Sequence, residues 1–296
     1  MIRILDPGPQ TTVQDLGRPG QLRVGVPPSG PLDRDAFVAA NRLVANEPSA
    51  AGLECTLIGP RFETDAACAI AVTGAAMDVT VNGQPAPAWS TIHLAPGDVT
   101  RIGTAKRGVR AYVAISGGID VPLVLGSRST YMRGRLGGHE GRALRKGDVL
   151  RVFPAAVPPL VQTTPPSITD EDTTIRVVLG PQADRFTEEG IATFLGHAYE
   201  MLPQSDRMGA RLKGPRIAHA RGHDIISDGI ALGTIQVPGD GQPIVLLMDR
   251  QSTGGYTKLA TVCSFDIGRL AQVKPGRRVR FRAITVNEAH ELSRSQ

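Results

Sequence analysis

The chain has 296 residues, of which 41% are hydrophobic and 21% charged, a balance typical of a globular protein with a buried core. The formal net charge is +5, and the three cysteines include no CxxC pair, which argues against a disulfide framework and a thiolate zinc site. No apolar run approaches the roughly 18 residues of a membrane span, and the first residues lack a signal-peptide pattern, so we expect a cytoplasmic protein without a membrane partner.

Short apolar segments closed by Gly, Asn or Asp predict a mainly β chain with a few helices. The expected strands are 68–74, 76–83, 109–118, 174–180 and 243–249. Asn82 and Gly83 form a pair typical of a tight hairpin. A helix is expected at 33–45, where Asp33 provides the cap, and another at 187–195.

Near the C-terminus, three arginines alternate with apolar residues, which predicts a half-buried strand with one solvated face. These are Arg278, Arg280 and Arg282. No aromatic residues interleave on that face, so we expect no nucleic acid as a partner.

A Pro-rich segment, 154–173, has the composition of a linker and predicts two units, 1–153 and 174–296. Short landmarks recur in the same order in both halves. GPQ occurs at 8–10 and 180–182, and GQP at 83–85 and 241–243. This order favours an internal duplication, with chance recurrence as the alternative.

Four segments combine hydroxyl residues, glycines and arginines, as an anion or amide site requires. They are 11–20 followed by 25–33, then 125–130, 205–212 and 249–258. The alternative is that the glycines and serines make tight turns and the arginines pair with nearby aspartates. No GxxxxGK[ST] or GxSxG motif is present, and His219 and His223 lack helical surroundings, so we expect neither a P-loop nor a metal site.

Together these segments resemble the allophanate hydrolase subunit 2 family, which includes the C-type component of bacterial 5-oxoprolinase, an antagonist of a sporulation kinase inhibitor and part of the urea carboxylase carboxyltransferase domain. The resemblance is carried by TTVQDLGRPG, GVPPSGPLD, GSRST, SDRMGARLKG, IQVPGDGQP and STGGYTKLATV. It covers nearly the whole chain. Pro31, Leu32 and Thr257 depart from the family pattern.

The resemblance implies two cyclophilin-like β-barrel units and a partner, the B-type (subunit 1) chain. It also implies an A-type oxoprolinase subunit and ATP-dependent opening of the pyroglutamate lactam, with this chain inactive alone. The candidate catalytic residues, which stabilise charge or transfer protons, are Arg18, Asp33, Arg128, Asp206, Arg207 and Asp249. The candidate substrate-binding residues are Ser29, Ser129, Thr130, Gln236, Thr253, Gly254, Gly255 and Tyr256.

Two other functions stay open. One is the carboxyltransferase half of a biotin-dependent urea or amide carboxylase. Its biotin would sit on a separate carrier, since none of the five lysines lies between two methionines. The other is a non-catalytic regulator that binds a kinase inhibitor.

Overall fold

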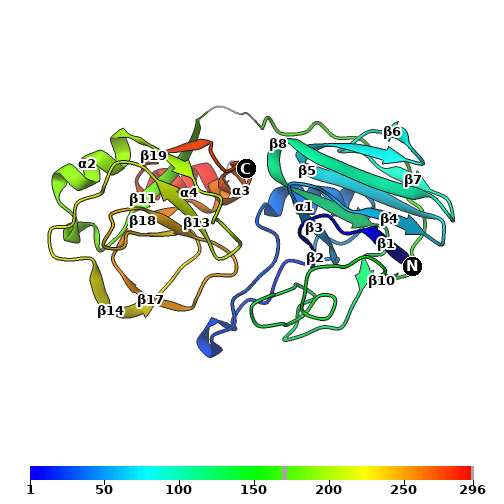
Figure 1. Ribbon diagram of the computed structural model, residues 1–296, viewed down its shortest axis with the longest axis horizontal. Helices are drawn as coiled ribbons and strands as arrows, with labels where there is room; N and C mark the ends of the chain where they lie inside the picture. The colour runs from blue at the N-terminus through cyan, green and yellow to red at the C-terminus, as the bar shows by residue number, and fades with distance from the viewer. Residues whose placement is uncertain (169–171, 295–296) are drawn as a thin grey trace. The chain divides into compact units, whose positions relative to one another are not determined.

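The computed structural model describes residues 1–168 and 172–294. The chain divides into two compact units, coloured along the chain in Figure 1. Unit 1 comprises 1–21 and 28–168, and unit 2 comprises 22–27 and 172–294. Both are mainly β, as expected. No helix within the described ranges is long and apolar enough to cross a membrane.

Unit 1 is built on one sheet of ten strands, in the order β2-β3-β8-β4-β1-β10-β9, with β5 bridging β8 to β6 and β7. The strands are β1 Ile2–Asp6, β2 Thr11–Gln14, β3 Gly52–Thr56, β4 Arg61–Thr64, β5 Cys68–Val81, β6 Gln84–Ala86, β7 Ile92–Leu94, β8 Val99–Ile115, β9 Ile119–Asp120 and β10 Val149–Val152. The pairing of two long strands, β5 and β8, forms its centre.

Successive side chains of β5 point to opposite faces of the sheet, and each face packs against a different apolar cluster. Ile70 and Val72 join the main core, whereas Ala69 and Ala71 face α1, Arg34–Leu43. The small alanine side chains let the helix approach the sheet closely, and Figure 1 shows α1 beside β5 and β8. The helix is capped as predicted, because Asp33 accepts a hydrogen bond from the backbone of its first turn.

The two strands expected at 68–74 and 76–83 are a single strand, β5. Its register shifts at Gly74, which has φ +83°. A Cβ there would lie 2.4 Å from the carbonyl oxygen of Arg110, so only glycine fits the bulge. The predicted hairpin follows, with Asn82 and Gly83 both at positive φ between β5 and β6.

Part of the predicted linker, 154–168, belongs to unit 1. Thr91 donates its backbone N–H to Val161, and Thr163 donates to Trp89. These hydrogen bonds hold the segment against residues 89–91, directly before β7, and so give its backbone groups partners. Residues 169–171 of the predicted linker lie outside the described residues, and its last two, Asp172 and Thr173, belong to unit 2, where Thr173 begins β11.

Unit 2 contains a closed barrel, in the order β11-β18-β15-β16-β13-β12-β19, and a two-stranded ribbon, β14-β17. Its strands are β11 Thr173–Leu179, β12 Ala198–Met201, β13 Gly209–Lys213, β14 Asp224–Gly229, β15 Thr234–Gln236, β16 Ile244–Leu246, β17 Thr253–Tyr256, β18 Lys258–Val262 and β19 Arg278–Ala283. Parallel pairing of β11 with β19 closes the barrel.

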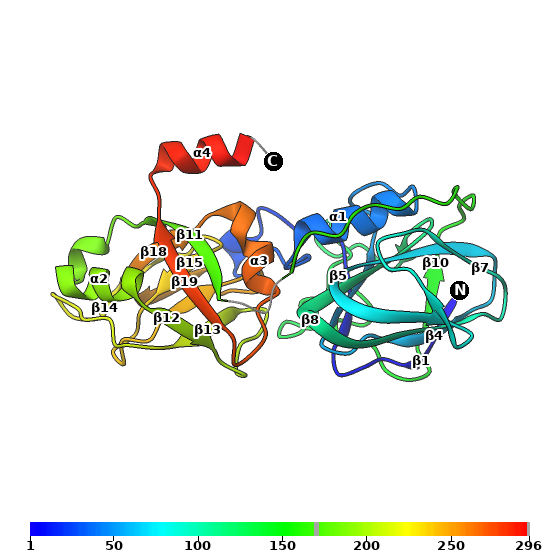
Figure 2. The ribbon, with the colours of Figure 1, turned by 90° about the horizontal axis from the view of Figure 1, so that it is seen from above.

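The helices of unit 2 are α2 Glu188–Gly196, α3 Ile267–Ala271 and α4 Val286–Arg294, with short 3-10 turns at Leu22–Val24, Ala183–Arg185 and Ser264–Asp266. The predicted second helix is α2, capped by Thr187. In Figure 2, α4 extends away from the barrel, and it has no buried residue. The arginine-rich segment is β19, whose Val279 and Phe281 are buried while the three arginines stay exposed. The internal duplication stays a prediction.

Candidate functional site

A buried carboxylate holds together the loops of unit 1 that the sequence singled out. Asp15, directly after β2, is 7% exposed. Its Oδ1 accepts hydrogen bonds from the hydroxyls of Ser127 at 2.5 Å and Ser129 at 2.7 Å, and from the backbone N–H of Gly17 at 2.9 Å. Its Oδ2 accepts from the backbone N–H of Arg128 at 2.6 Å. Asp15 therefore locks 125–130 onto the N-terminal loop.

The two candidate arginines of unit 1 donate to backbone carbonyls. Arg18 is 1% exposed, and its guanidinium donates to the carbonyl oxygens of Ser129 and, at 3.3 Å, Val124. The Nε of Arg128 donates to the carbonyl of Val121 at 3.0 Å. Both guanidinium groups thus fix the 121–130 loop.

The candidate hydroxyls of this unit differ in their partners. Ser129 bonds Asp15, and Thr130 donates to the carbonyl of Val13 at 2.8 Å. Ser29 is fully buried with φ 55°, and its hydroxyl has no hydrogen-bond partner among the described residues. A buried hydroxyl without a partner is uncommon, which keeps Ser29 as the candidate donor of unit 1.

Asp33 caps α1 and borders a second buried carboxylate. Its backbone N–H donates to the hydroxyl of Tyr112 at 2.8 Å, and that hydroxyl donates to Glu54 at 2.9 Å. Glu54 also accepts the backbone N–H of Leu32 at 2.9 Å. Burial, followed by the charges of Glu54 and Asp33, holds the pKa of Tyr112 well above its usual value, so Tyr112 acts as a neutral donor here.

In unit 2, a buried ion pair lies at one end of the β13–β16 pair. Arg207 and Asp249 are each 5% exposed. The Arg207 Nε lies 2.9 Å from Oδ2 of Asp249, and Nη2 lies 3.3 Å from Oδ1. The Asp249 N–H also donates to the Arg207 carbonyl at 2.9 Å, which continues the ladder beyond the strands. The guanidinium plane is therefore fixed by both side chain and backbone.

The neighbouring loop of unit 2 gathers further candidates. Arg250 is buried, its Nε donates to the carbonyl of Ile230 at 3.1 Å, and burial lowers its pKa. A Cβ on Gly254 would lie 2.7 Å from Ile230 and 2.8 Å from the amide of Gln236. Gln236 donates to the carbonyl of Tyr256 at 3.3 Å. Glycine at 254 is thus required for this amide to approach the ribbon.

The remaining candidates lie on exposed segments. Asp206 is exposed and accepts backbone N–H groups of Met208 at 2.8 Å and Gly209 at 3.1 Å, so it shapes a turn. Thr253, Gly255 and Tyr256 belong to β17 of the ribbon, where Thr253 and Tyr256 are exposed. The side chains of the unit 2 candidates therefore fall into two groups. The buried group is Arg207, Gln236 and Asp249, and the exposed group is Asp206, Thr253 and Tyr256.

The His219 and His223 rings lie 6.1 Å apart between centroids. The Nε2 of His219 lies 3.0 Å from the carbonyl of Val237, and burial lowers its pKa. Within 1–168 and 172–294, no three His, Cys, Asp or Glu side chains are arranged to hold a metal ion.

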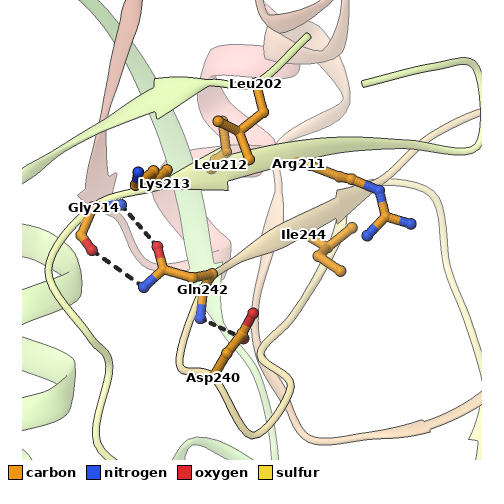
Figure 3. A pocket seen from close by; sticks show the side chains of 8 residues that line it. All are labelled: Leu202, Arg211, Leu212, Lys213, Gly214, Asp240, Gln242 and Ile244. Carbon is orange, nitrogen blue, oxygen red and sulfur yellow. Dashed lines mark hydrogen bonds between the residues drawn. The ribbon is translucent and has the colours of Figure 1, made fainter. Parts of the chain in front are cut away.

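Unit 2 also has a pocket of about 400 Å³, drawn in Figure 3, that none of the candidate residues lines. Its walls are Leu202, Arg211, Leu212, Lys213, Gly214, Asp240, Gln242 and Ile244. It lies at the opposite end of the β13–β16 pair from Arg207 and Asp249, since it includes the last residues of β13 and those preceding β16.

Comparison with known proteins identifies the family. Residues 24–283 match the family described as carboxyltransferase domain, subdomains A and B. The chain belongs to this carboxyltransferase family. It is 34% identical to the C-type component of Escherichia coli 5-oxoprolinase, with 100% of this chain and 95% of that protein covered. It is 37% identical to urea amidolyase of Lachancea kluyveri, where 99% of this chain matches only 17% of that protein.

A solved structure agrees with this membership. The Kluyveromyces lactis urea carboxylase matches this chain with a TM-score of 0.93 at 34% identity, over 99% of this chain and 28% of that one. The family resemblance expected from the sequence is therefore confirmed, as is the mainly β, barrel-containing fold.

Sequence reasoning missed the residues that organise this carboxyltransferase chain internally. Asp15 and Ser127 lie within the chosen segments but were not distinguished from their neighbours, and Glu54 lies outside all of these segments. Arg250, next to Asp249, was also passed over. The available signal was a polar residue beside a fully buried strand, as at Asp15 after β2 and at Glu54 within β3.

Proposed function

We propose that this chain is the C-type subunit of an ATP-dependent 5-oxoprolinase that opens pyroglutamate to glutamate together with a B-type partner and an A-type subunit. The observation that carries the proposal is the extent of the match to the C-type components of 5-oxoprolinases. It runs over 95% of the Escherichia coli protein and 94% of the Haemophilus influenzae protein. The urea amidolyases match over only a small part of their length.

Opening a lactam develops negative charge on the carbonyl oxygen and requires a proton to leave the attacking water. The Arg207–Asp249 pair is the group in unit 2 best suited to the first task. Its guanidinium is almost fully shielded from water, where a fixed charge acts more strongly on a developing oxyanion. We assign charge stabilisation to Arg207 and orientation of Arg207 to Asp249.

Asp33 and Asp206 accept hydrogen bonds from nearby backbone groups and contribute to local loop structure. The amide of Gln236, next to the Gly254 backbone, is assigned to substrate oxygens. In unit 1 the same role falls to Ser29, because Ser129 and Thr130 already donate within the fold.

The candidate arginines of unit 1 do not fit a nucleotide phosphate site. Arg18 and Arg128 direct donors to backbone carbonyls, and the sequence has no P-loop. We therefore assign ATP to the partner subunits of the complex and derive no step of this chain through it.

The test is co-expression with the B-type and A-type subunits, followed by measurement of glutamate released from pyroglutamate with and without ATP. The proposal predicts release that needs all subunits and ATP. A complete, stable complex that leaves pyroglutamate unchanged would refute it.

Two matched variants distinguish a role of the buried Arg207–Asp249 pair in the reaction from a general effect of changing a surface arginine. Arg207→Lys keeps the charge but loses the two-point contact, and we expect a fall in kcat of about 100-fold, as for loss of one oxyanion donor. Arg221→Lys is the control, because Arg221 pairs with Asp184 at 3.5 Å on an exposed surface. Equal activity of the two variants would remove Arg207 from the reaction.

The second candidate is the carboxyltransferase half of a biotin-dependent urea or amide carboxylase, favoured by the family description and by the match to urea carboxylase. Biotin would come from a separate carrier protein. Avidin distinguishes the candidates, because it blocks a biotin-dependent reaction and leaves pyroglutamate opening unaffected.

A further inference from the structure

The pocket of unit 2 carries two cations on the outward-facing side of β13. In β13, Arg211 and Lys213 are exposed, whereas Leu212 between them is buried in the barrel. Ile244 pairs with Arg211 across β13 and β16. Leucine and isoleucine side chains line the same pocket as the two cations (Figure 3) and give it an apolar base. Strand geometry spaces the two cationic residues about 6.6 Å apart along β13.

The polar wall of the pocket is held in place by backbone contacts. The Gln242 side chain accepts the N–H of Gly214 at 2.8 Å and donates to its carbonyl at 3.2 Å. Asp240 accepts the N–H of Gln242 through Oδ1 at 3.0 Å and is exposed. Figure 3 shows both contacts beside the end of β13. The 240–242 loop thus presents one carboxylate at a fixed position opposite the two cations.

The charges of the pocket are not neutralised by one another. No carboxylate within the described ranges forms an ion pair with Arg211 or Lys213, although Glu200 is the register partner of Lys213 on β12. Two cations, one carboxylate and an apolar base match a ligand with two anionic groups, one ammonium group and a short carbon chain.

We propose that this pocket binds an amino dicarboxylate of the size of glutamate, with one carboxylate on Arg211, the other on Lys213 and the ammonium on Asp240. The choice of ligand rests on the proposed function. Water adds to the lactam carbonyl and the carbon–nitrogen bond breaks. The product therefore has a second carboxylate and an ammonium group that the substrate lacks. The pocket distinguishes the two by these groups and is a product-sensing site.

The test measures binding to the purified full chain by isothermal titration, with L-glutamate, glutarate, pyroglutamate and inorganic phosphate as probes. L-Glutamate is expected to bind most tightly. Glutarate lacks the ammonium group, and pyroglutamate has only one carboxylate. Each is expected to bind at least about fivefold more weakly than L-glutamate. Pyroglutamate or phosphate binding as tightly as glutamate would overturn the proposal.

Variants assign the binding to this pocket. Arg211→Gln and Lys213→Gln are each expected to weaken glutamate binding about fivefold, and Asp240→Asn to remove the preference over glutarate. Arg278→Gln is the control, because Arg278 is exposed on β19 and does not line the pocket. All four side chains are exposed, so folding is retained. Unchanged binding in the Arg211 and Lys213 variants, or no glutamate binding to the unaltered chain, would refute the site.

Glutamate binding to the pocket and pyroglutamate opening by the complex are tested by separate experiments. Glutamate binding that depends on Arg211 and Lys213 supports the pocket even if the assembled complex leaves pyroglutamate intact, a result that refutes only the proposed function. If the complex opens pyroglutamate but the chain does not bind glutamate, only the proposed binding site is refuted.

Discussion

Replacing Asp15 by alanine leaves four donors of unit 1 without their shared acceptor. Each hydrogen bond to a charged group contributes about 1.5–3 kcal/mol, but four bonds to one carboxylate are not additive, so we expect a loss of about 4 kcal/mol. Asp15→Asn is expected to lose about half of that. Its amide oxygen can accept the three donors at Oδ1, while its NH₂ group faces the N–H of Arg128.

The assay uses the single tryptophan of the chain. Trp89 is 8% exposed and packs in the α1 cluster of unit 1, so its fluorescence reports the unfolding of that unit. With a urea dependence of about 2 kcal/mol per molar, the Asp15→Ala midpoint should fall by about 2 M. Asp78→Ala is the control, since Asp78 pairs with Lys106 on an exposed surface. An Asp15→Ala midpoint equal to that of Asp78→Ala, or a larger loss in Asp15→Asn, would refute the reasoning.

Three further predictions concern buried groups elsewhere. Asp249→Ala should destabilise unit 2 by about 3–5 kcal/mol, because it leaves Arg207 buried without its carboxylate, and hydrogen exchange in β13 and β16 should accelerate; unchanged exchange would contradict this. Burial raises the pKa of the Asp266 carboxyl, but the hydrogen bonds from Arg176 outweigh burial. The pKa of Asp266 therefore lies below its usual value. The carboxylate therefore stabilises the fold above the unfolded pKa of about 3.9 and loses this effect as pH falls through the folded pKa. Asp266→Asn should flatten the acid limb of Tm against pH, and parallel profiles would count against this. Burial raises the pKa of Cys55 to about 12, so iodoacetamide at neutral pH should label it only in urea, as read by peptide mass spectrometry. Rapid labelling of the native chain would exclude this account.

The elements that the sequence predicted well are those with a local cause. The Asp33 cap and apolar face predict α1, the Asn82–Gly83 pair predicts its hairpin, and the arginine alternation predicts β19. β5 was divided in two because Gly74 interrupts the pattern like a turn, and only pairing with β8 shows that the strand continues. Residues 154–168 resemble a linker in sequence because their backbone pairing with residues 89–91 leaves no pattern in their side chains.

The sequence predicted which segments contribute to the site, but not how their side chains are arranged in space. Asp15 is joined to residues more than a hundred positions away, and no local pattern encodes such a contact. Arg207 and Asp249 were chosen separately for their residue types, and the continued β13–β16 ladder is what brings them together. The pocket lined by Arg211 and Lys213 was not predicted, although Arg211 lies in the chosen segment 205–212, because Asp240 and Gln242 join it only through the fold.

The closing strand of the barrel gives unit 2 a late assembly step. β19 pairs with β11 on one side and β12 on the other, and both of these strands precede it by many residues. A chain still being synthesised, or cut before Arg278, would hold two unsatisfied strand edges facing one gap. Such edges are templates for association with other chains. Premature termination near the C-terminus should therefore lead to aggregation rather than to a shortened soluble protein.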